Sequence, residues 1–278
     1  MTEHPYTVVD VFADQPYHGN PLAVVSRAGG VSAAAMQRFA SWTNLSETTF
    51  IVPPTDAAAD YRLRIFTPQQ ELPFAGHPTL GSCHAWLAAG GVPRQADMII
   101  QQCGAGLVRI RRSPDGRLAF AAPPLRRAGP LDAATRAQLL GELNLDDAQV
   151  RDAAWVDNGP GWAGLLLADT ATVLALNPVR VSQPVGVIGA YPAGAPAAFE
   201  VRAFFPQHGF VLEDPVTGSL NASLAQWLIG AGYAHAPYVV AQGQVLGRAG
   251  RVHIAGDAAG DIWVGGATLT CVRGTVVL

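Results

Sequence analysis

Two short segments of the chain place a proton-carrying side chain directly before a proline and a Gly-Ser pair. They read GHPTLGS and EDPVTGS, and laying one on the other puts His77 on Asp214 and Ser82 on Ser219. Imidazole and carboxylate groups are the side chains most often used to move protons in catalysis. The matched pair therefore predicts acid–base chemistry. For a lone Asp-Pro, a helix cap is the commoner role, because the carboxylate accepts an unpaired backbone N–H.

The match between the two segments extends upstream, which indicates an internal duplication. RIFTPQ begins at Arg64 and RAFFPQ begins at Arg202, 138 residues later. This spacing is close to half of the 278-residue chain, so the sequence has the form of two diverged copies of one unit. A chain of this length is also expected to divide into two domains of roughly 130 residues.

The elements that must position these residues are short strands with few helices. Runs of β-branched and aromatic residues between turn signals predict the strands, and helices are predicted over residues 32–42, 78–89 and 215–229. The last two helices are apolar nearly all round, so each is expected to be enclosed. The predicted fold class is α+β, with two pseudo-symmetric lobes that each wrap a curved antiparallel β-sheet or barrel around a central α-helix.

We place the N-terminal lobe at residues 1–118, with a returning C-terminal strand at 267–278, and the C-terminal lobe at residues 119–266. Lobes related by a pseudo-twofold axis are expected to bring both helix starts to one cleft. Backbone N–H groups and the helix dipole there favour a substrate carboxylate. In this arrangement His77 and Asp214 occupy the same position on their helices and face each other across the cleft.

Composition excludes several other kinds of chemistry. All 18 basic residues are arginine, which excludes a lysine Schiff base and a P-loop lysine. The histidines and the three cysteines have no metal-ligand spacing, and no dinucleotide-binding glycine motif follows a strand, so we expect neither a metal nor a cofactor. A net charge of −3 provides no excess of positive charge for binding nucleic acid. No segment is typical of a membrane span or a signal peptide. We therefore expect a cytoplasmic protein with a small-molecule carboxylate substrate.

Several motifs together resemble the PhzF (phenazine biosynthesis-like) family across essentially the whole chain. They are VDVFADQPYHGNPLAVV, NLSETTFI, RIFTPQQELPFAGHPTLGS, EDPVTGS and VGGATLTCVRGTVVL. The resemblance implies a diaminopimelate epimerase-like fold, with the active site between two lobes, and a homodimer. It also implies a cofactor-independent isomerase, since the best-known member of the family isomerises dihydro-hydroxyanthranilic acid without a cofactor.

The same resemblance assigns roles to individual residues. The glutamate of NLSETTF, Glu47, corresponds to the proton shuttle, and His77 and Asp214 to residues that handle protons or orient the substrate. Ser219, with the backbone of Gly76 and Gly218, corresponds to the group that holds the substrate carboxylate. A carboxylate at its ordinary pKa of about 4.3 is a weak base toward carbon acids, so we expect Glu47 to be desolvated when substrate is enclosed.

Two alternatives to the isomerase remain open, and one related enzyme class is disfavoured. The alternatives are an amino-acid epimerase or racemase with His77 and Asp214 as its bases, and a non-catalytic small-molecule binding protein. A two-thiol racemase is disfavoured because the cysteines lie away from these two positions. Leu220 and Asn221 also depart from the GSAH found in many relatives, which bears on the substrate.

Overall fold

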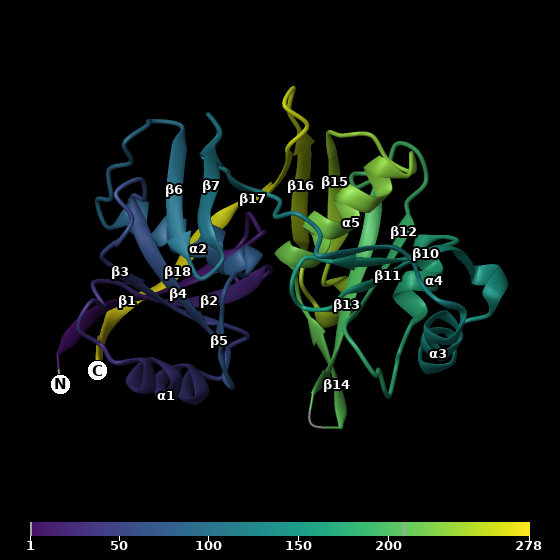
Figure 1. The fold of residues 1–278 in the computed structure, drawn as a ribbon, viewed down its shortest axis with the longest axis horizontal. Coiled ribbons are helices and arrows are strands. Elements are labelled where there is room, and N and C mark those ends of the chain that lie inside the picture. Colours follow the sequence, from purple (N-terminus) through teal and green to yellow (C-terminus); the bar gives the residue numbers. More distant parts are fainter. Residues whose placement is uncertain (1, 208) are drawn as a thin grey trace. The chain divides into compact units, whose positions relative to one another are not determined.

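The computed structural model describes residues 2–207 and 209–278, and the chain forms two compact units. Unit 1 is Met1–Ala121 with Gly265–Leu278, and unit 2 is Ala122–Val264. The elements of unit 1 are β1 (Glu3–Val11), β2 (Asn20–Val25), α1 (Ala33–Thr43), β3 (Thr48–Val52), β4 (Tyr61–Phe66), β5 (Glu71–Leu72), α2 (Gly76–Ala88), β6 (Met98–Cys103), β7 (Gly106–Arg112), β8 (Leu118–Ala121) and β18 (Thr268–Val277) (Figure 1).

Unit 2 contains three of the five α-helices in the described part of the chain. Its elements are β9 (Arg127–Pro130), α3 (Ala133–Leu143), a short 3-10 turn (Asp147–Gln149), β10 (Val150–Asp157), β11 (Ala163–Leu167), α4 (Thr170–Ala175), β12 (Val185–Ala190), β13 (Phe199–Gln207), β14 (Phe210–Asp214), α5 (Gly218–Gly230), β15 (Tyr238–Gln242), a second 3-10 turn (Gln244–Leu246), β16 (Gly250–Gly256) and β17 (Ile262–Gly266).

The two units repeat one strand-pairing scheme. In unit 1, β2 pairs in parallel with β3, β3 and β5 run antiparallel to β4, and β6 lies parallel to β4. In unit 2, β11 pairs in parallel with β12, β12 and β14 run antiparallel to β13, and β15 lies parallel to β13. The parallel pairs occur where a helix connects the two strands, since parallel neighbours need a crossover. Each sheet is therefore mixed, where the sequence predicted antiparallel pairing alone.

The central helices α2 and α5 are enclosed by their own sheets, which confirms the predicted α+β fold class. In α2, Leu80, Cys83 and Ala85 are buried, and in α5 Leu220 and Leu224 are buried. Neither helix has a polar face, so the free energy of removing its side chains from water favours enclosure. A Cβ added to Gly81 of α2 would lie 2.7 Å from a methyl carbon of Leu22, so the absence of a side chain permits this close approach to β2.

The other helices cover the outer faces of the sheets. Helix α1 packs Met36 and Ala40 against Phe50 and Phe66 of β3 and β4. The apolar face of α3 packs in the same way against the sheet of unit 2 through Leu139. Ser32 caps α1 by accepting a hydrogen bond from the amide of Ala35, so α1 begins where the sequence predicts it.

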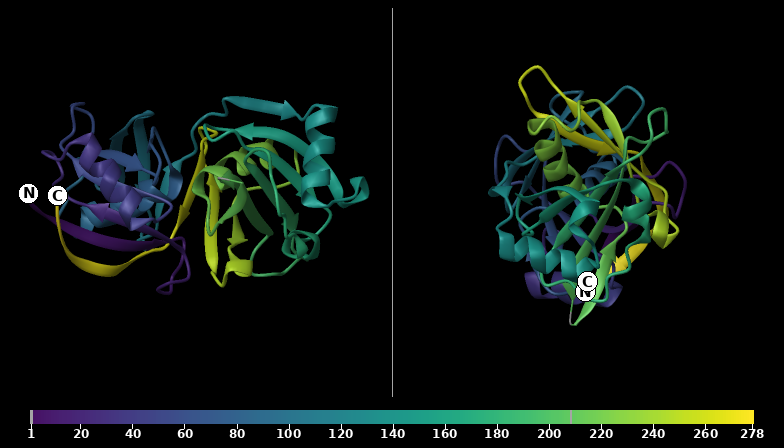
Figure 2. Two further views of the ribbon diagram at one scale, coloured as in Figure 1. Left: turned by 90° about the horizontal axis from the view of Figure 1, so that it is seen from below. Right: turned by 90° about the vertical axis from the view of Figure 1, so that its right-hand side faces the viewer.

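Strand β18 returns the end of the chain to unit 1. It pairs antiparallel with β1, and the backbones of Thr2 and Leu278 exchange hydrogen bonds of 2.7 and 3.0 Å. The N and C labels lie side by side in both views of Figure 2. No helix in residues 2–207 or 209–278 is long and apolar enough to cross a membrane.

Candidate functional site

Glu47 and His77 lie beside each other in unit 1. Glu47 is the last residue before β3, and His77 lies in the first turn of α2. Oε2 of Glu47 is 3.4 Å from Nε2 of His77, and their side chains are 15% and 4% exposed. The separation is longer than the 2.7–2.9 Å of a charge-assisted hydrogen bond. The two groups are therefore neighbours whose separation exceeds that of such a bond.

The burial of His77 determines its charge. Removal from water lowers the pKa of the His77 imidazole from 6.5 to about 3, because a charged ring in the interior loses its hydration. The Glu47 carboxylate lies 3.4 Å from the ring, but the pKa of His77 stays below its ordinary value. The ring is consequently neutral at physiological pH and carries a single proton.

Asn20 is a further member of this group that sequence reasoning missed. It begins β2, is fully buried, and its amide nitrogen lies 3.4 Å from Nδ1 of His77. Asp10 of β1 holds the segment that leads into Asn20. Oδ2 of Asp10 accepts the backbone N–H groups of His18 and Gly19 at 2.9 and 3.0 Å. The available signal was the segment VDVFADQPYHGNP, which contains both Asp10 and Asn20.

Asp214 lies in unit 2 at the end of β14, and the predicted start of the following helix is wrong. Helix α5 begins at Gly218 with Thr217 as its N-cap residue, and not at Pro215. The reason is a side chain from a neighbouring strand. Oε1 of Gln242 on β15 accepts the backbone N–H of Thr217 at 3.0 Å, which serves the helix start in place of the Asp214 carboxylate. His77 and Asp214 therefore do not occupy equivalent positions on their helices.

Gly218 and Ser219 open α5, as Gly76 opens α2. Ser219 is fixed from two sides: Nε1 of Trp162 points at its hydroxyl oxygen at 3.3 Å, and Nδ2 of Asn158 donates to its carbonyl at 2.8 Å. The side-chain oxygen of Asn158, Oδ1, is buried and makes no hydrogen bond within residues 2–207 and 209–278. The first N–H groups of a helix lack intrahelical partners, so this end of α5 can accept an anion.

The duplicated RIFTPQ and RAFFPQ segments each supply the arginine of a bidentate ion pair. Arg64 on β4 donates to both carboxylate oxygens of Glu71 at 2.7 and 2.6 Å. Arg202 on β13 donates to both oxygens of Glu213 at 2.8 and 2.7 Å. The second pair is buried, and Arg202 also donates to the last carbonyls of α4. These pairs join the two strands of a hairpin immediately before each central helix.

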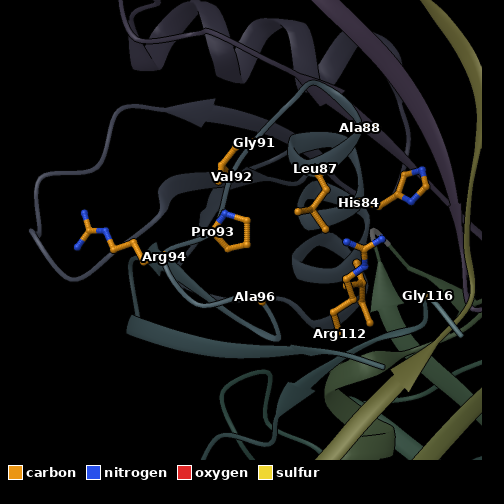
Figure 3. Close-up of a pocket in the computed structure, with 11 residues that line it drawn as sticks. His84, Leu87, Ala88, Gly91, Val92, Pro93, Arg94, Ala96, Arg112 and Gly116 are labelled. Atoms are coloured by element: carbon orange, nitrogen blue, oxygen red, sulfur yellow. The ribbon is translucent and has the colours of Figure 1, made fainter. Parts of the chain in front are cut away.

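A separate hollow of about 700 Å³ lies in unit 1, by the C-terminal half of α2 (Figure 3). Its lining includes His84, Arg94 and Arg112 but none of the candidate site residues. His84 is also engaged with β18, since its two ring nitrogens lie 2.9 and 3.0 Å from the hydroxyls of Thr270 and Thr268. We therefore interpret His84 as a structural link between α2 and β18.

In the part of the chain that the structure describes, the cysteines and the acidic residues do not gather into a metal site. Within the described ranges, no group of three histidine, cysteine, aspartate or glutamate side chains is arranged to hold a metal ion. Cys83 and Cys103 are buried, and burial raises the pKa of the Cys83 thiol to about 12. A thiol of this kind is a poor nucleophile and base at neutral pH.

Comparison with known proteins identifies the family. The sequence profile of the phenazine biosynthesis-like (PhzC-PhzF) family matches residues 9–274. The chain is 35% identical over 295 residues to antisense-enhancing sequence 1 of Schizosaccharomyces pombe, covering 99% of both proteins. It is 34% identical over 268 residues to the trans-2,3-dihydro-3-hydroxyanthranilate isomerase of Pseudomonas aeruginosa, covering 93% of this chain and 92% of that one.

A solved structure agrees with this assignment at the level of the fold. The crystal structure of a phenazine biosynthesis protein of the PhzF family from Bacillus anthracis covers 100% of both chains, with a TM-score of 0.84 at 20% identity. The resemblance carried by the sequence motifs is thereby confirmed. The chain belongs to the phenazine biosynthesis-like family and is an isomerase of that family.

Proposed function

We propose that the protein is a cofactor-independent isomerase that moves a proton by acid–base chemistry on a small carboxylate-bearing substrate. The observation that carries the proposal is the pairing of a largely buried carboxylate, Glu47, with a neutral, buried imidazole, His77, at 3.4 Å. A carboxylate held beside a neutral imidazole in a water-poor setting suits the removal of a proton from carbon and its return elsewhere.

Glu47 is the proposed proton carrier. Its carboxylate takes a proton from a carbon atom of the substrate and returns it at a second carbon, so no net proton is gained or lost. His77 supports this transfer from one side. Because the amide nitrogen of Asn20 can only donate, Nδ1 of His77 is the acceptor and its single proton lies on Nε2, facing Glu47.

The residues of unit 2 have proposed roles in substrate orientation. Asp214 handles a proton or orients a polar group of the substrate. Ser219 and the backbone of Gly218 bind the substrate carboxylate, and the backbone of Gly76 in unit 1 has the same proposed role. The helix starts at Gly76 and Gly218 support this role, because helix N-termini favour negative charge.

Hydrogen exchange in heavy water tests this function. The protein is incubated in D₂O with a panel of small cyclic acids and amino acids, beginning with trans-2,3-dihydro-3-hydroxyanthranilate, the substrate in the name of the Pseudomonas aeruginosa relative. NMR then follows both isomerisation and deuterium incorporation. We expect a shifted double bond with deuterium at the new C–H position. Deuterium at an α-carbon without isomerisation indicates an epimerase instead, and binding without either change indicates a binding protein.

Glu47→Gln is the decisive variant, because it keeps the shape of the side chain and removes the proton carrier. General acid–base groups contribute about 10²- to 10⁴-fold in rate, so we expect a loss of this size in kcat. Glu3→Gln, which neutralises an exposed carboxylate of the same unit, is the matched control and should retain full activity. Turnover by Glu47→Gln at the rate of the unmodified protein would refute the assignment.

A further inference from the structure

Four polar residues of unit 2 form one hydrogen-bond network at the start of α5. Oε1 of Gln242 accepts from the backbone of Thr217 at 3.0 Å and from Nδ2 of Asn221 at 2.8 Å. Nε2 of Gln242 donates to the hydroxyl oxygen of Thr217 at 3.0 Å and to the carbonyl of Asp214 at 3.2 Å. The Thr217 hydroxyl in turn donates to Oδ2 of Asp214 at 2.6 Å.

The direction of every bond in this network is determined by donor and acceptor chemistry. The amide of Gln242 has one orientation, because its oxygen faces two N–H donors and its nitrogen faces two oxygen acceptors. The Thr217 hydroxyl oxygen is occupied as an acceptor by Gln242, and its single proton points at Asp214. A Thr217 hydroxyl that always donates favours the ionised carboxylate over the protonated acid.

Burial makes the network rigid. Gln242, Asn221 and Thr217 are 1%, 2% and 5% exposed, so water does not compete for their hydrogen bonds. Asn221 also donates to the carbonyl of Thr217 at 2.9 Å, which ties the second turn of α5 back to its cap. The side chain of Asn221 is thus directed into the protein. Asn221 stands where the GSAH of many relatives has histidine, so this difference changes the residues that hold Asp214 in place.

We propose that Thr217, Gln242 and Asn221 are positioning residues, which together hold a hydroxyl proton on Oδ2 of Asp214 and so fix that carboxylate in one orientation and in its ionised form. The significance for catalysis rests on the role assigned to Asp214 in the proposed function. The state of the carboxylate itself is independent of any substrate.

Thr217→Val tests the network, because valine has the shape of threonine without the hydroxyl. Carbon-13 NMR follows the titration of the Asp214 side chain in the free protein. A hydrogen bond to a charged group contributes about 1.5 kcal/mol or more, so loss of the hydroxyl should raise the titration midpoint of Asp214 by about one pKa unit. Thr217→Ser keeps the hydroxyl and should restore the original midpoint. Asn221→Leu, which removes one of the two donors to Gln242, should give a smaller shift in the same direction.

Ser223→Ala is the matched control on the same helix. The Ser223 hydroxyl is buried, and its contacts among the described residues are with the backbone carbonyls of Ser219 and Leu220, so its removal should leave Asp214 unchanged. Thermal unfolding establishes that each variant is folded. On a substrate identified by exchange in heavy water, the acid limb of kcat/KM should move with the titration midpoint in Thr217→Val and not in Thr217→Ser.

The proposal is overturned if Thr217→Val leaves the Asp214 midpoint within about 0.3 pKa unit of the unmodified protein, or if Thr217→Ser shifts as Thr217→Val does. The NMR titration requires no substrate. A failure of the isomerase proposal with a shifted midpoint therefore leaves the network assignment intact, and the reverse outcome refutes the network alone.

Discussion

Acidification should destabilise unit 1 through the buried imidazole of His77. Burial lowers the pKa of His77 from 6.5 to about 3, so the folded protein keeps the ring neutral while the unfolded chain takes up a proton below pH 6.5. Stability contributed in this way is complete above pH 6.5 and is lost as the pH falls toward 3. With about 1.4 kcal/mol for each pKa unit, the loss between pH 8 and pH 5 is about 2 kcal/mol.

His77→Gln isolates this contribution, because glutamine is polar and does not titrate. The free energy of unfolding of the variant, minus that of the unmodified protein, should increase by about 2 kcal/mol on going from pH 8 to pH 5, because only the unmodified protein loses the His77 contribution. Urea unfolding followed by tryptophan fluorescence measures the difference, and hydrogen exchange of the α2 amides reports on unit 1 by itself. Contributions from other groups, including His84, cancel in the comparison.

His235→Gln is the matched control, since it makes the same replacement at an exposed histidine. A constant difference for His77→Gln between pH 8 and pH 5 would show that the ring is not held neutral in the folded protein. A difference of the opposite sign would mean that His77 is protonated and paired with Glu47 in the folded state. Either result refutes the electrostatic reasoning for this pair.

Two further predictions concern the packing that positions the site. Arg202→Gln should cost about 3 kcal/mol or more in urea unfolding, because it leaves the buried Glu213 carboxylate unpaired, whereas Arg64→Gln at the more exposed copy should cost about 1 kcal/mol or less. Equal losses would contradict the difference in burial. Gly81→Ala should cost about 1–3 kcal/mol because its methyl group meets Leu22. Gly141→Ala on α3, where nothing lies within 4 Å of the added carbon, should stabilise by up to about 1 kcal/mol in the same urea assay.

Sequence reasoning identified features that local patterns encode and missed features that depend on distant side chains. The duplication, the enclosed helices and the candidate His77 follow from spacing and apolarity, whereas Glu47 came from motif resemblance alone. The start of α5 was misplaced because the backbone N–H of its N-cap residue, Thr217, is bound by Gln242 of a later strand and not by Asp214. Asn20 was missed for a similar reason, since its contact with His77 spans 57 positions.

Two of the helices were also absent from the sequence-based prediction. Helix α4 has only six residues, too few for a hydrophobic period to be recognised. Helix α3 is longer, and the sequence does contain a signal for its start. Asp132 accepts the backbone N–H of Thr135, as an aspartate before a helix commonly does. Neither helix carries a candidate site residue, so the expected chemistry does not depend on them.

The return of β18 to unit 1 has a consequence for folding during synthesis. Unit 2 is continuous in sequence, so residues 122–264 have all been translated before the ribosome reaches Gly265. The first strand of the chain, β1, must wait for β18 to supply one of its two neighbours. The half that is made first is therefore completed last, and until then one edge of β1 is open to pairing with other nascent chains.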